Sequence, residues 1–273
     1  VYLWTPMSLQ EQLTRRTMSA RDVVSEYANN KSLTPAEKAA LDEVIATAKG
    51  KRILDIGVGG GRTVKALRAI SEDYLGIDYC EEMVEVCKKL YPEARFAHAD
   101  ARDMKDVPSG SIQLAVFSMN GLAMVGHEDR LAILREIRRV LAPGGHFLFS
   151  TYNLASSDTT RGFQFPDHHL RGTRNPVKLA LRSARFAQRV AVRVMNRRRY
   201  TRHAERGPGY AIINDQSHDY ATMLYYVDMK TQHDQLEDAG FDRGSVKMWE
   251  RSGRATDAST TDSSITFLVR ARA

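Results

Sequence analysis

The stretch "ILDIGVGGG" at residues 53–61 joins a short apolar segment to a turn with four glycines in five positions, and the apolar segment contains one acid, Asp55. The next residues, "RTVKALRAI" (62–70), place apolar side chains at helical spacing. A strand, a glycine turn and a helix therefore follow one another. Because glycines let a ligand approach the backbone closely, the stretch predicts a binding site as well as a local fold.

The same alternation continues to about residue 152. Strand-like runs at 74–78, 94–100, 112–118 and 146–152 are interleaved with helical patterns at 81–90 and 129–141. Short strands alternating with such helices predict a doubly wound, Rossmann-like α/β sheet covered on both faces. In these sheets the ligand lies beyond the carboxyl ends of the strands, where the glycine turn, Asp78 and Asp100 are expected.

The details of the turn narrow the class of ligand. A dinucleotide-binding turn that begins at Gly57 requires glycine at position 62, where the chain has Arg62, and no Gly-Lys-Ser/Thr of a phosphate loop follows. An acid, Asp78, ends the next strand 17 residues after Gly61. A carboxylate at that place accepts hydrogen bonds from ribose hydroxyls. The pattern predicts a ligand that has a ribose and does not need a pyrophosphate.

Five successive stretches resemble, in order, the motifs of class I S-adenosylmethionine-dependent methyltransferases, in particular the small-molecule group called methyltransferase type 11. They are "LDIGVGGG" (54–61), "GIDYCEEMV" (76–84), "AHADARDM" (97–104), "IQLAVFSMNGL" (112–122) and "REIRRVLAPGGHFLFS" (135–150), and the resemblance returns at "LEDAGF" (236–241). It implies a seven-stranded sheet of order 3-2-1-4-5-7-6 whose last strand, "ITFLVRAR" (265–272), is antiparallel.

The resemblance also implies S-adenosyl-L-methionine as cofactor and S-adenosyl-L-homocysteine as product. Asp78 would bind the ribose, Asp100 the adenine amino group, and Ser118 would lie near the sulfonium. Asp55 would help to hold the amino group of the methionine part, directly or through water. The full set of expected cofactor-binding residues is Asp55, Gly57, Gly59, Gly61, Asp78, Tyr79, Met83, Asp100, Ala101, Ser118 and, over the methionine carboxylate, Tyr27.

The segments beside the core suggest a division of the chain. Residues 1–50 are expected to form a helical cap over the cofactor, with Thr34 and Pro35 beginning one helix. Residues 51–152 and 230–273 form the predicted core. Residues 153–229 form an insertion that is expected to act as a lid and to recognise the substrate.

A basic helix is predicted within the insertion, at residues 176–200. Residues 171–206 hold twelve Lys or Arg and one acid, in a chain whose net charge is +7. Basic side chains recur every three or four positions from Lys178 to Arg197, opposite an apolar side that includes Leu181 and Val192. Such a helix can cover the active site with its apolar side, bind RNA, or contact anionic substrates or a membrane surface. Because Phe186 is the one aromatic residue between the basic residues from Lys178 to Arg197, where stacking on successive bases would require several, the lid is the preferred interpretation.

Methyl transfer requires a base only when the acceptor holds its proton firmly. The residues proposed for that role are His127, His168, His218 and Tyr220. His168 and His169 are adjacent with no third ligand nearby, so no metal site is predicted.

These observations predict a methyltransferase that acts by in-line displacement on N or O of a small molecule, which is anionic if the basic helix recruits it. The alternatives are an RNA methyltransferase that uses the helix 176–200 and a non-catalytic nucleoside-binding regulatory protein. DNA-base methylation is disfavoured because "SMNGL" (118–122) stands where base-amine methylases have Asn-Pro-Pro-Tyr. Two cysteines without metal or disulfide spacing, and the lack of a signal-peptide pattern or of a run of about 20 apolar residues, predict a cytoplasmic location.

Overall fold

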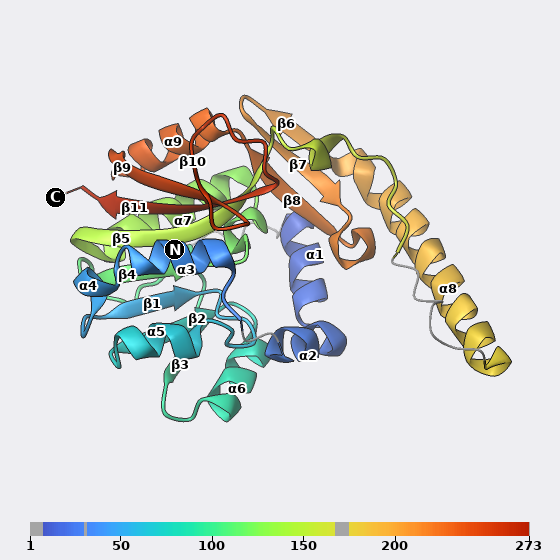
Figure 1. Ribbon diagram of the computed structural model, residues 1–273, viewed down its shortest axis with the longest axis horizontal. Helices are drawn as coiled ribbons and strands as arrows, with labels where there is room; N and C mark the ends of the chain where they lie inside the picture. Colours follow the sequence, from blue (N-terminus) through green and yellow to red (C-terminus); the bar gives the residue numbers. More distant parts are fainter. Residues whose placement is uncertain (1–7, 30–31, 167–174, 273) are drawn as a thin grey trace.

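The computed structural model describes residues 8–29, 32–166 and 175–272, and Figure 1 shows a twisted sheet with helices on both faces. Its continuous part has, in spatial order, β3 (Arg95–His98), β2 (Tyr74–Asp78), β1 (Ile53–Ile56), β4 (Ile112–Phe117), β5 (Leu141–Asn153), β11 (Ser264–Ala271) and β9 (Phe241–Glu250). The first five strands run parallel, and β11 runs antiparallel to both neighbours. The predicted order 3-2-1-4-5-7-6 is thus confirmed; the short strand β10 (Ala255–Thr256) extends the edge beside β9.

Alternate side chains of the central strands enter two separate cores. In β5, Phe147 and Phe149 belong to one apolar cluster and Leu148 to the other, and all three are buried. The first cluster is covered by α7 (His127–Val140) and α9 (Met229–Asp238). The second is covered by α3 (Pro35–Asp42), α4 (Ile45–Ala48), α5 (Val64–Ile70) and, through Cys87, α6 (Glu81–Leu90). Burial on both faces explains why these strands read as nearly continuous apolar runs.

The N-terminal helices divide between two places. Helices α1 (Leu9–Met18) and α2 (Arg21–Asn29) lie beyond the carboxyl ends of the parallel strands, as Figure 1 shows. Helix α3 instead packs on the sheet, and it begins as predicted, because the Thr34 hydroxyl accepts from the Glu37 N–H while the Glu37 carboxylate accepts from the Thr34 N–H. Only α1 and α2 are therefore positioned to cap a ligand.

The described part of the insertion extends the sheet. It contains α8 (Pro176–Tyr200), β6 (Glu205–Gly207), β7 (Tyr210–Asp215) and β8 (Thr222–Val227). Strand β8 pairs in parallel with the last two residues of β5, and β7 and β6 follow antiparallel. The short turns η3 (Thr201–His203) and η4 (Ser217–Tyr220) join these elements, while η2 (Ser157–Thr160) precedes α8 and η1 (Gly121–Ala123) follows β4. Leu13 of α1 packs with Ile212 of β7 and Tyr225 of β8.

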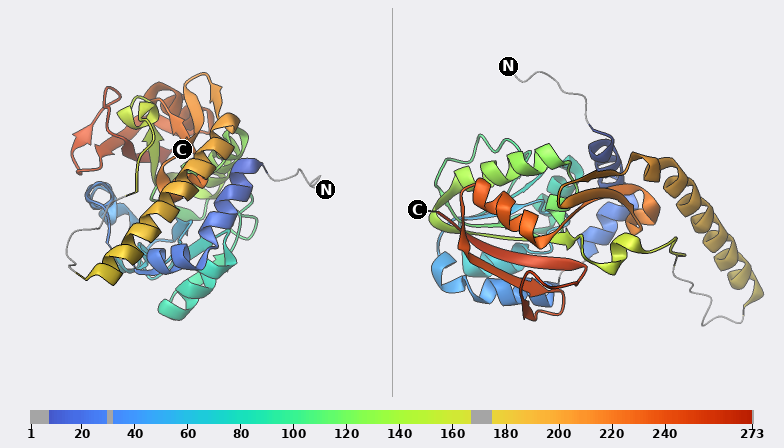
Figure 2. Two further views of the ribbon diagram at one scale, coloured as in Figure 1. Left: turned by 90° about the vertical axis from the view of Figure 1, so that its right-hand side faces the viewer. Right: turned by 90° about the horizontal axis from the view of Figure 1, so that it is seen from above.

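The orientation of α8 differs from the expectation that its apolar side docks over the pocket. The C-terminal part of the basic side docks instead: Arg193 lies against the body with an 11% exposed side chain and pairs with Asp219, whereas Arg182 and Arg185 are exposed. Two residues of the apolar side also face outward, since Leu181 is 56% and Met195 is 62% exposed. Figure 2 shows that the N-terminal end of α8 projects away from the rest of the molecule. Within the described ranges no helix, α8 included, is long and apolar enough to cross a membrane.

Candidate cofactor and acceptor site

The glycine turn after β1 has three left-handed glycines that serve different contacts. Gly57 and Gly59 have φ values of +63° and +52° and line a cavity. A Cβ on Gly59 would meet only Tyr27 Cδ1 at 3.4 Å and the Gly57 carbonyl oxygen at 3.9 Å, so this position is open toward the cavity. A Cβ on Gly61 would lie 2.5 Å from Tyr91 Cε2. The missing side chain of Gly61 is thus explained by packing against α6, and Gly61 does not border the cavity.

The inner cavity lies where the carboxyl ends of β1, β2 and β4 meet α1 and α2, and its empty space is about 970 Å³. It brings together nine of the eleven predicted cofactor residues: Tyr27, Gly57, Gly59, Asp78, Tyr79, Met83, Asp100, Ala101 and Ser118. The other two, Asp55 and Gly61, do not line this cavity.

Asp78 is held at the end of β2 by backbone donors. Its two carboxylate oxygens accept from the Gly59 N–H at 2.8 Å and from the Cys80 N–H at 2.9 Å. Burial raises the pKa of Asp78 above its ordinary value, although these two hydrogen bonds act in the opposite direction. Since each carboxylate oxygen can accept more than one hydrogen bond, Asp78 keeps capacity for hydroxyl donors in the cavity.

Asp55 has a different position from the one expected for direct contact. Its side chain is 1% exposed, and one oxygen accepts from the Thr63 hydroxyl at 2.5 Å and the Tyr74 hydroxyl at 2.8 Å. The other oxygen has no partner among the described residues. Burial raises the pKa of Asp55 to about 6. The acid therefore ties the glycine turn to the start of α5 and to β2, and only the route through water remains open for its predicted role.

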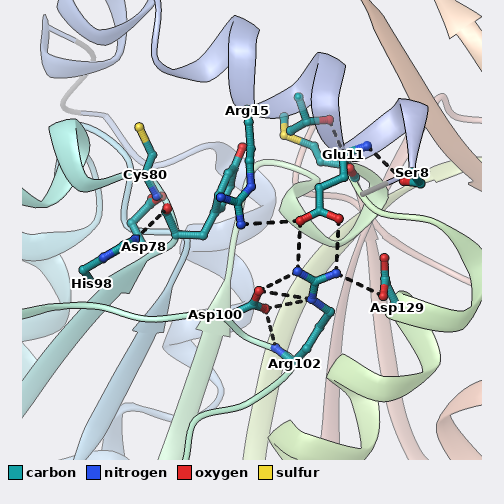
Figure 3. Close-up of polar contacts among 12 residues, drawn as sticks. Ser8, Glu11, Arg15, Asp78, Cys80, His98, Asp100, Arg102 and Asp129 are labelled. Carbon is teal, nitrogen blue, oxygen red and sulfur yellow. Dashed lines mark hydrogen bonds and ion pairs between the residues drawn. The ribbon is translucent and has the colours of Figure 1, made fainter. Parts of the chain in front are cut away.

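Asp100 is hydrogen-bonded by Arg102, a residue that the motif analysis missed. The Arg102 guanidinium reaches Asp100 at 2.6 Å, Glu11 of α1 at 3.0 Å and Asp129 of α7 at 3.2 Å, as Figure 3 shows. Burial alone would raise the pKa of Asp100, but the hydrogen bonds and charge of Arg102 outweigh it and hold that pKa below its ordinary value. Contact between Asp100 and an adenine amino group would require Arg102 to release one bond, while Glu11 and Asp129 continue to hold it.

Arg62 is the second residue whose role was missed, since the motif analysis used it only to exclude a dinucleotide turn. It forms a buried ion pair with Glu37 of α3 at 2.5 Å, and it donates to the Ser118 hydroxyl at 3.0 Å. This pairing connects the end of the glycine turn to the end of β4. No local pattern signals it, because Glu37 also reads as an ordinary helix-capping residue.

An outer cavity opens beside the inner one, with about 2170 Å³ of empty space that includes open solvent at its mouth. Its wall includes residues of α1, α2, β8, η4 and α8, among them Arg16, Arg189, Arg193 and His218. The two cavities share a border formed by Tyr27, Gly57, Gly59, Ser118, Met119 and Met124. The two cavities are therefore adjacent along this border.

Of the predicted bases, the structure brings only His218 to the outer cavity. His127 stacks on Tyr210 with ring centroids 4.1 Å apart and lies 2.8 Å from the Tyr225 hydroxyl, away from both cavities. Tyr220 is buried, and its hydroxyl accepts from the Gln164 N–H outside the outer cavity. The expectation of bases at these two positions is not supported, because neighbours distant in sequence capture both side chains. His168 lies outside the described residues.

Strained backbone gathers at the border and wall of the outer cavity. Met119 and Asn120 follow β4 with φ values of +51° and +57°, and His218, Asp219 and Tyr220 form a run with φ values of +47° to +60°. Non-glycine residues rarely adopt this region, at a cost of about 1 to 3 kcal/mol each. Such strain persists where the surrounding contacts hold it, and it is concentrated at functional sites.

Known proteins share both the core sequence and the fold. The family model described as "Methyltransferase domain" matches residues 54–149. The ubiquinone biosynthesis O-methyltransferase of Acinetobacter baylyi is 27% identical over 134 residues, which are 48% of this chain and 56% of that protein. The chain thus spans little more than half the length of this curated relative.

Two solved structures cover nearly the whole chain. The CcbJ methyltransferase of Streptomyces caelestis has a TM-score of 0.60 at 18% identity, over 92% of this chain and 96% of that one. The Burkholderia thailandensis 1,6-didemethyltoxoflavin-N1-methyltransferase, solved with 1,6-didemethyltoxoflavin and S-adenosylhomocysteine, has a TM-score of 0.55 at 12% identity, over 99% and 94%. At these identities the likeness establishes the fold.

Proposed function

We propose that this chain, whose residues 54–149 match the family model described as "Methyltransferase domain", is a class I S-adenosylmethionine-dependent methyltransferase. It would bind S-adenosyl-L-methionine in the inner cavity and methylate N or O of a small molecule in the outer cavity. One observation carries the proposal: the two cavities meet along the border that Tyr27, Gly59 and Ser118 help to form. The names of the relatives support it, since they include an O-methyltransferase and an N1-methyltransferase with its small molecule bound.

The residues that line the inner cavity suit this cofactor. Gly59 leaves the backbone open for the amino-acid part, and Asp78 offers acceptors for the ribose hydroxyls. Asp100 and the backbone of Ala101 would contact the adenine. Tyr79 and Met83 supply apolar surface beside it, and Ser118 and Tyr27 stand at the border with the acceptor.

When bound, the cofactor would supply a methyl group on a sulfonium, and the acceptor would take that methyl group by in-line displacement. The chain's contribution is then to align the acceptor with that methyl group and to exclude water. The acceptor's proton must also leave. His218 is the one predicted base that borders the outer cavity among the described residues, so it contacts the acceptor either as a base or by packing.

The charge around the outer cavity favours an anionic acceptor. Among the residues whose side chains are described, Arg16, Arg189 and Arg193 line it with one acid, Asp219, while a further arginine of the wall, Arg62, is neutralised by Glu37. A cleft with an excess of positive charge attracts anions and raises their association rate. The pairing of Arg189 and Arg193 with Asp219 also favours a small molecule over RNA, because it holds these two guanidinium groups at the wall of the outer cavity. A cytoplasmic location remains part of this proposal.

Calorimetry with S-adenosyl-L-homocysteine tests the cofactor assignment. Asp78→Ala should weaken binding by about 1.5 to 3 kcal/mol, the range for losing hydrogen bonds to a charged group. Asp73→Ala is the matched control, because that carboxylate stands just before β2, pairs with Arg52 and Arg95, and is 39% exposed. Equal affinities of the two variants would remove Asp78 from the site, and no binding by the unaltered chain would remove the proposed function.

A further inference from the structure

We infer, on the basis of the function proposed above, that the acceptor is a planar aromatic molecule whose ring inserts between Tyr27 and His218. The two rings are nearly parallel, with an interplanar angle of 23°, and their centroids are 6.5 Å apart. By comparison, Tyr152 and Tyr226 lie in contact at 5.0 Å and 27°. Since aromatic planes in van der Waals contact are about 3.5 Å apart, a third ring needs about 7 Å between the outer two. The distance between the Tyr27 and His218 centroids is close to that value, so we infer that a modest adjustment of the two side chains admits a ring between them.

The position of this pair suits an acceptor. Both side chains line the outer cavity, and Tyr27 also borders the inner one. A ring between them would lie at the border, so a hydroxyl or amine on its edge could face the inner cavity. A ring stacked on both faces is also fixed in its plane, which is the alignment that in-line transfer requires.

The left-handed backbone at His218 supports a binding role for its imidazole ring. His218 begins the run of three left-handed residues in η4. Three contacts hold this run: Arg193 pairs with the Asp219 carboxylate at 2.7 Å, the Asn196 amide donates to the Asp219 carbonyl oxygen, and the Asn214 amide donates to the Tyr220 carbonyl oxygen. A histidine that only met solvent would not need such a conformation.

Met119 supplies an apolar contact next to the pair. It borders both cavities, has a φ of +51°, and leaves 43% of its surface exposed. Thioether sulfur packs favourably at the edge of aromatic rings. A bound ring would therefore cover the exposed apolar surface of Met119.

The chemistry of the step balances without a further reactant. The bond between sulfur and the methyl carbon breaks, and its electron pair stays on the sulfur. A lone pair on the acceptor oxygen or nitrogen forms the new bond to that carbon. The proton of the hydroxyl or amine leaves to solvent through the mouth of the outer cavity, so His218 acts through its ring face.

Paired probes test planarity directly. The full chain, saturated with S-adenosyl-L-homocysteine, is titrated by calorimetry with 4-hydroxybenzoate and 6-hydroxy-2-naphthoate, and with the saturated counterpart 4-hydroxycyclohexanecarboxylate. We expect at least one planar acid to bind about tenfold more tightly than the saturated acid, the range that one stacked ring supplies. Equal binding of planar and saturated acids, or binding of neither, overturns the aromatic acceptor. The proposed function survives that result as long as S-adenosyl-L-homocysteine binds.

Two substitutions at one position separate stacking from base catalysis. His218→Phe keeps a ring and removes the titratable group, whereas His218→Leu removes both. We expect the affinity for the tighter planar probe to fall less than about threefold in His218→Phe and about tenfold in His218→Leu. The affinity for S-adenosyl-L-homocysteine serves as the control and should be unchanged in both. Equal affinity of the two variants for the probe contradicts the sandwich.

Discussion

The inner and outer cavities share a wall, yet the chain builds them in opposite ways. Apart from the cover of α1 and α2 and from Met83 and Ile133, the described wall of the inner cavity consists of the ends of successive strands and the segments that follow them. The outer cavity depends on residues from distant parts of the chain, such as Tyr27 and His218, which meet because β8 pairs with β5. The comparison teaches that a site made by consecutive βα units can be read from motifs, whereas a site made by distant segments depends on packing.

The largest expected effect concerns the inner cavity. Gly59→Val should abolish binding of S-adenosyl-L-homocysteine, because the new side chain enters open cavity space at a left-handed φ of +52°. Gly110→Val is the matched control: it has a similar φ of +65° but nothing within 4 Å of its Cβ position, and it lies away from the cavity. Calorimetry and thermal unfolding measure binding and stability. Comparable losses of binding in both variants would show that backbone strain, and not cavity space, causes the effect.

Asp55, the buried acid of β1 that precedes the glycine turn, should make the free energy of unfolding depend on pH. The pKa of Asp55 is about 6 in the folded protein, against an ordinary value of 3.8. The folded state then binds the proton more tightly than the unfolded state, so the free energy of unfolding should fall as the pH rises from about 4 to 6 and level off above that. Asp55→Asn should remove about 2 kcal/mol of this decline.

Chemical denaturation at several pH values checks the prediction for Asp55. Asp78, whose pKa is also raised, contributes in the same direction in both proteins and therefore does not disturb the difference. Asp73→Asn serves as the surface control. An unchanged pH slope in Asp55→Asn would contradict the linkage.

The docking of α8 provides the third test. Arg193→Met should weaken the attachment of α8 by about 1 to 2 kcal/mol, because it removes the pair with Asp219 and leaves that carboxylate half-buried. Leu181→Gln should change stability by less than about 0.5 kcal/mol, since the leucine is 56% exposed. Hydrogen exchange across residues 176–200 reports the attachment. Faster exchange in the leucine variant than in the arginine variant would instead support the hypothesis that α8 docks through its apolar side.

The smallest effect is expected at the connection between α1 and the strand ends. Arg102→Met removes the bridge from Asp100 to Glu11 and Asp129. Because the guanidinium is 29% exposed, the affinity for S-adenosyl-L-homocysteine should fall only about fivefold. Hydrogen exchange of residues 9–18 should rise in the same variant. Arg95→Met, whose pair with Asp73 is on the surface, should change neither measurement.

The strand order and the inner cavity were predictable from the sequence for a shared reason. Apolar runs buried on both faces, the glycine turn and the acids that end strands are each determined within a few residues, so Asp78 could be placed before its contacts were known. Arg62 and Arg102 could not be placed, because their partners Glu37 and Glu11 come from helices elsewhere in the chain. The side on which α8 docks was wrong for a similar reason: Asp219 and the strained turn attract the arginines, and no helical pattern reveals that attraction.

The length of β5 has a mechanical consequence. Its residues 146–152 pair with β11 along their whole length, while Tyr152 and Asn153 also pair with β8. One continuous strand thus joins the central sheet to β8, the strand that follows His218 in the chain, and its hydrogen bonds on both edges oppose bending between them. This strand therefore helps to set the distance between the inner cavity and His218. We expect any opening of the outer cavity to involve the helices of its wall, α1, α2 and α8.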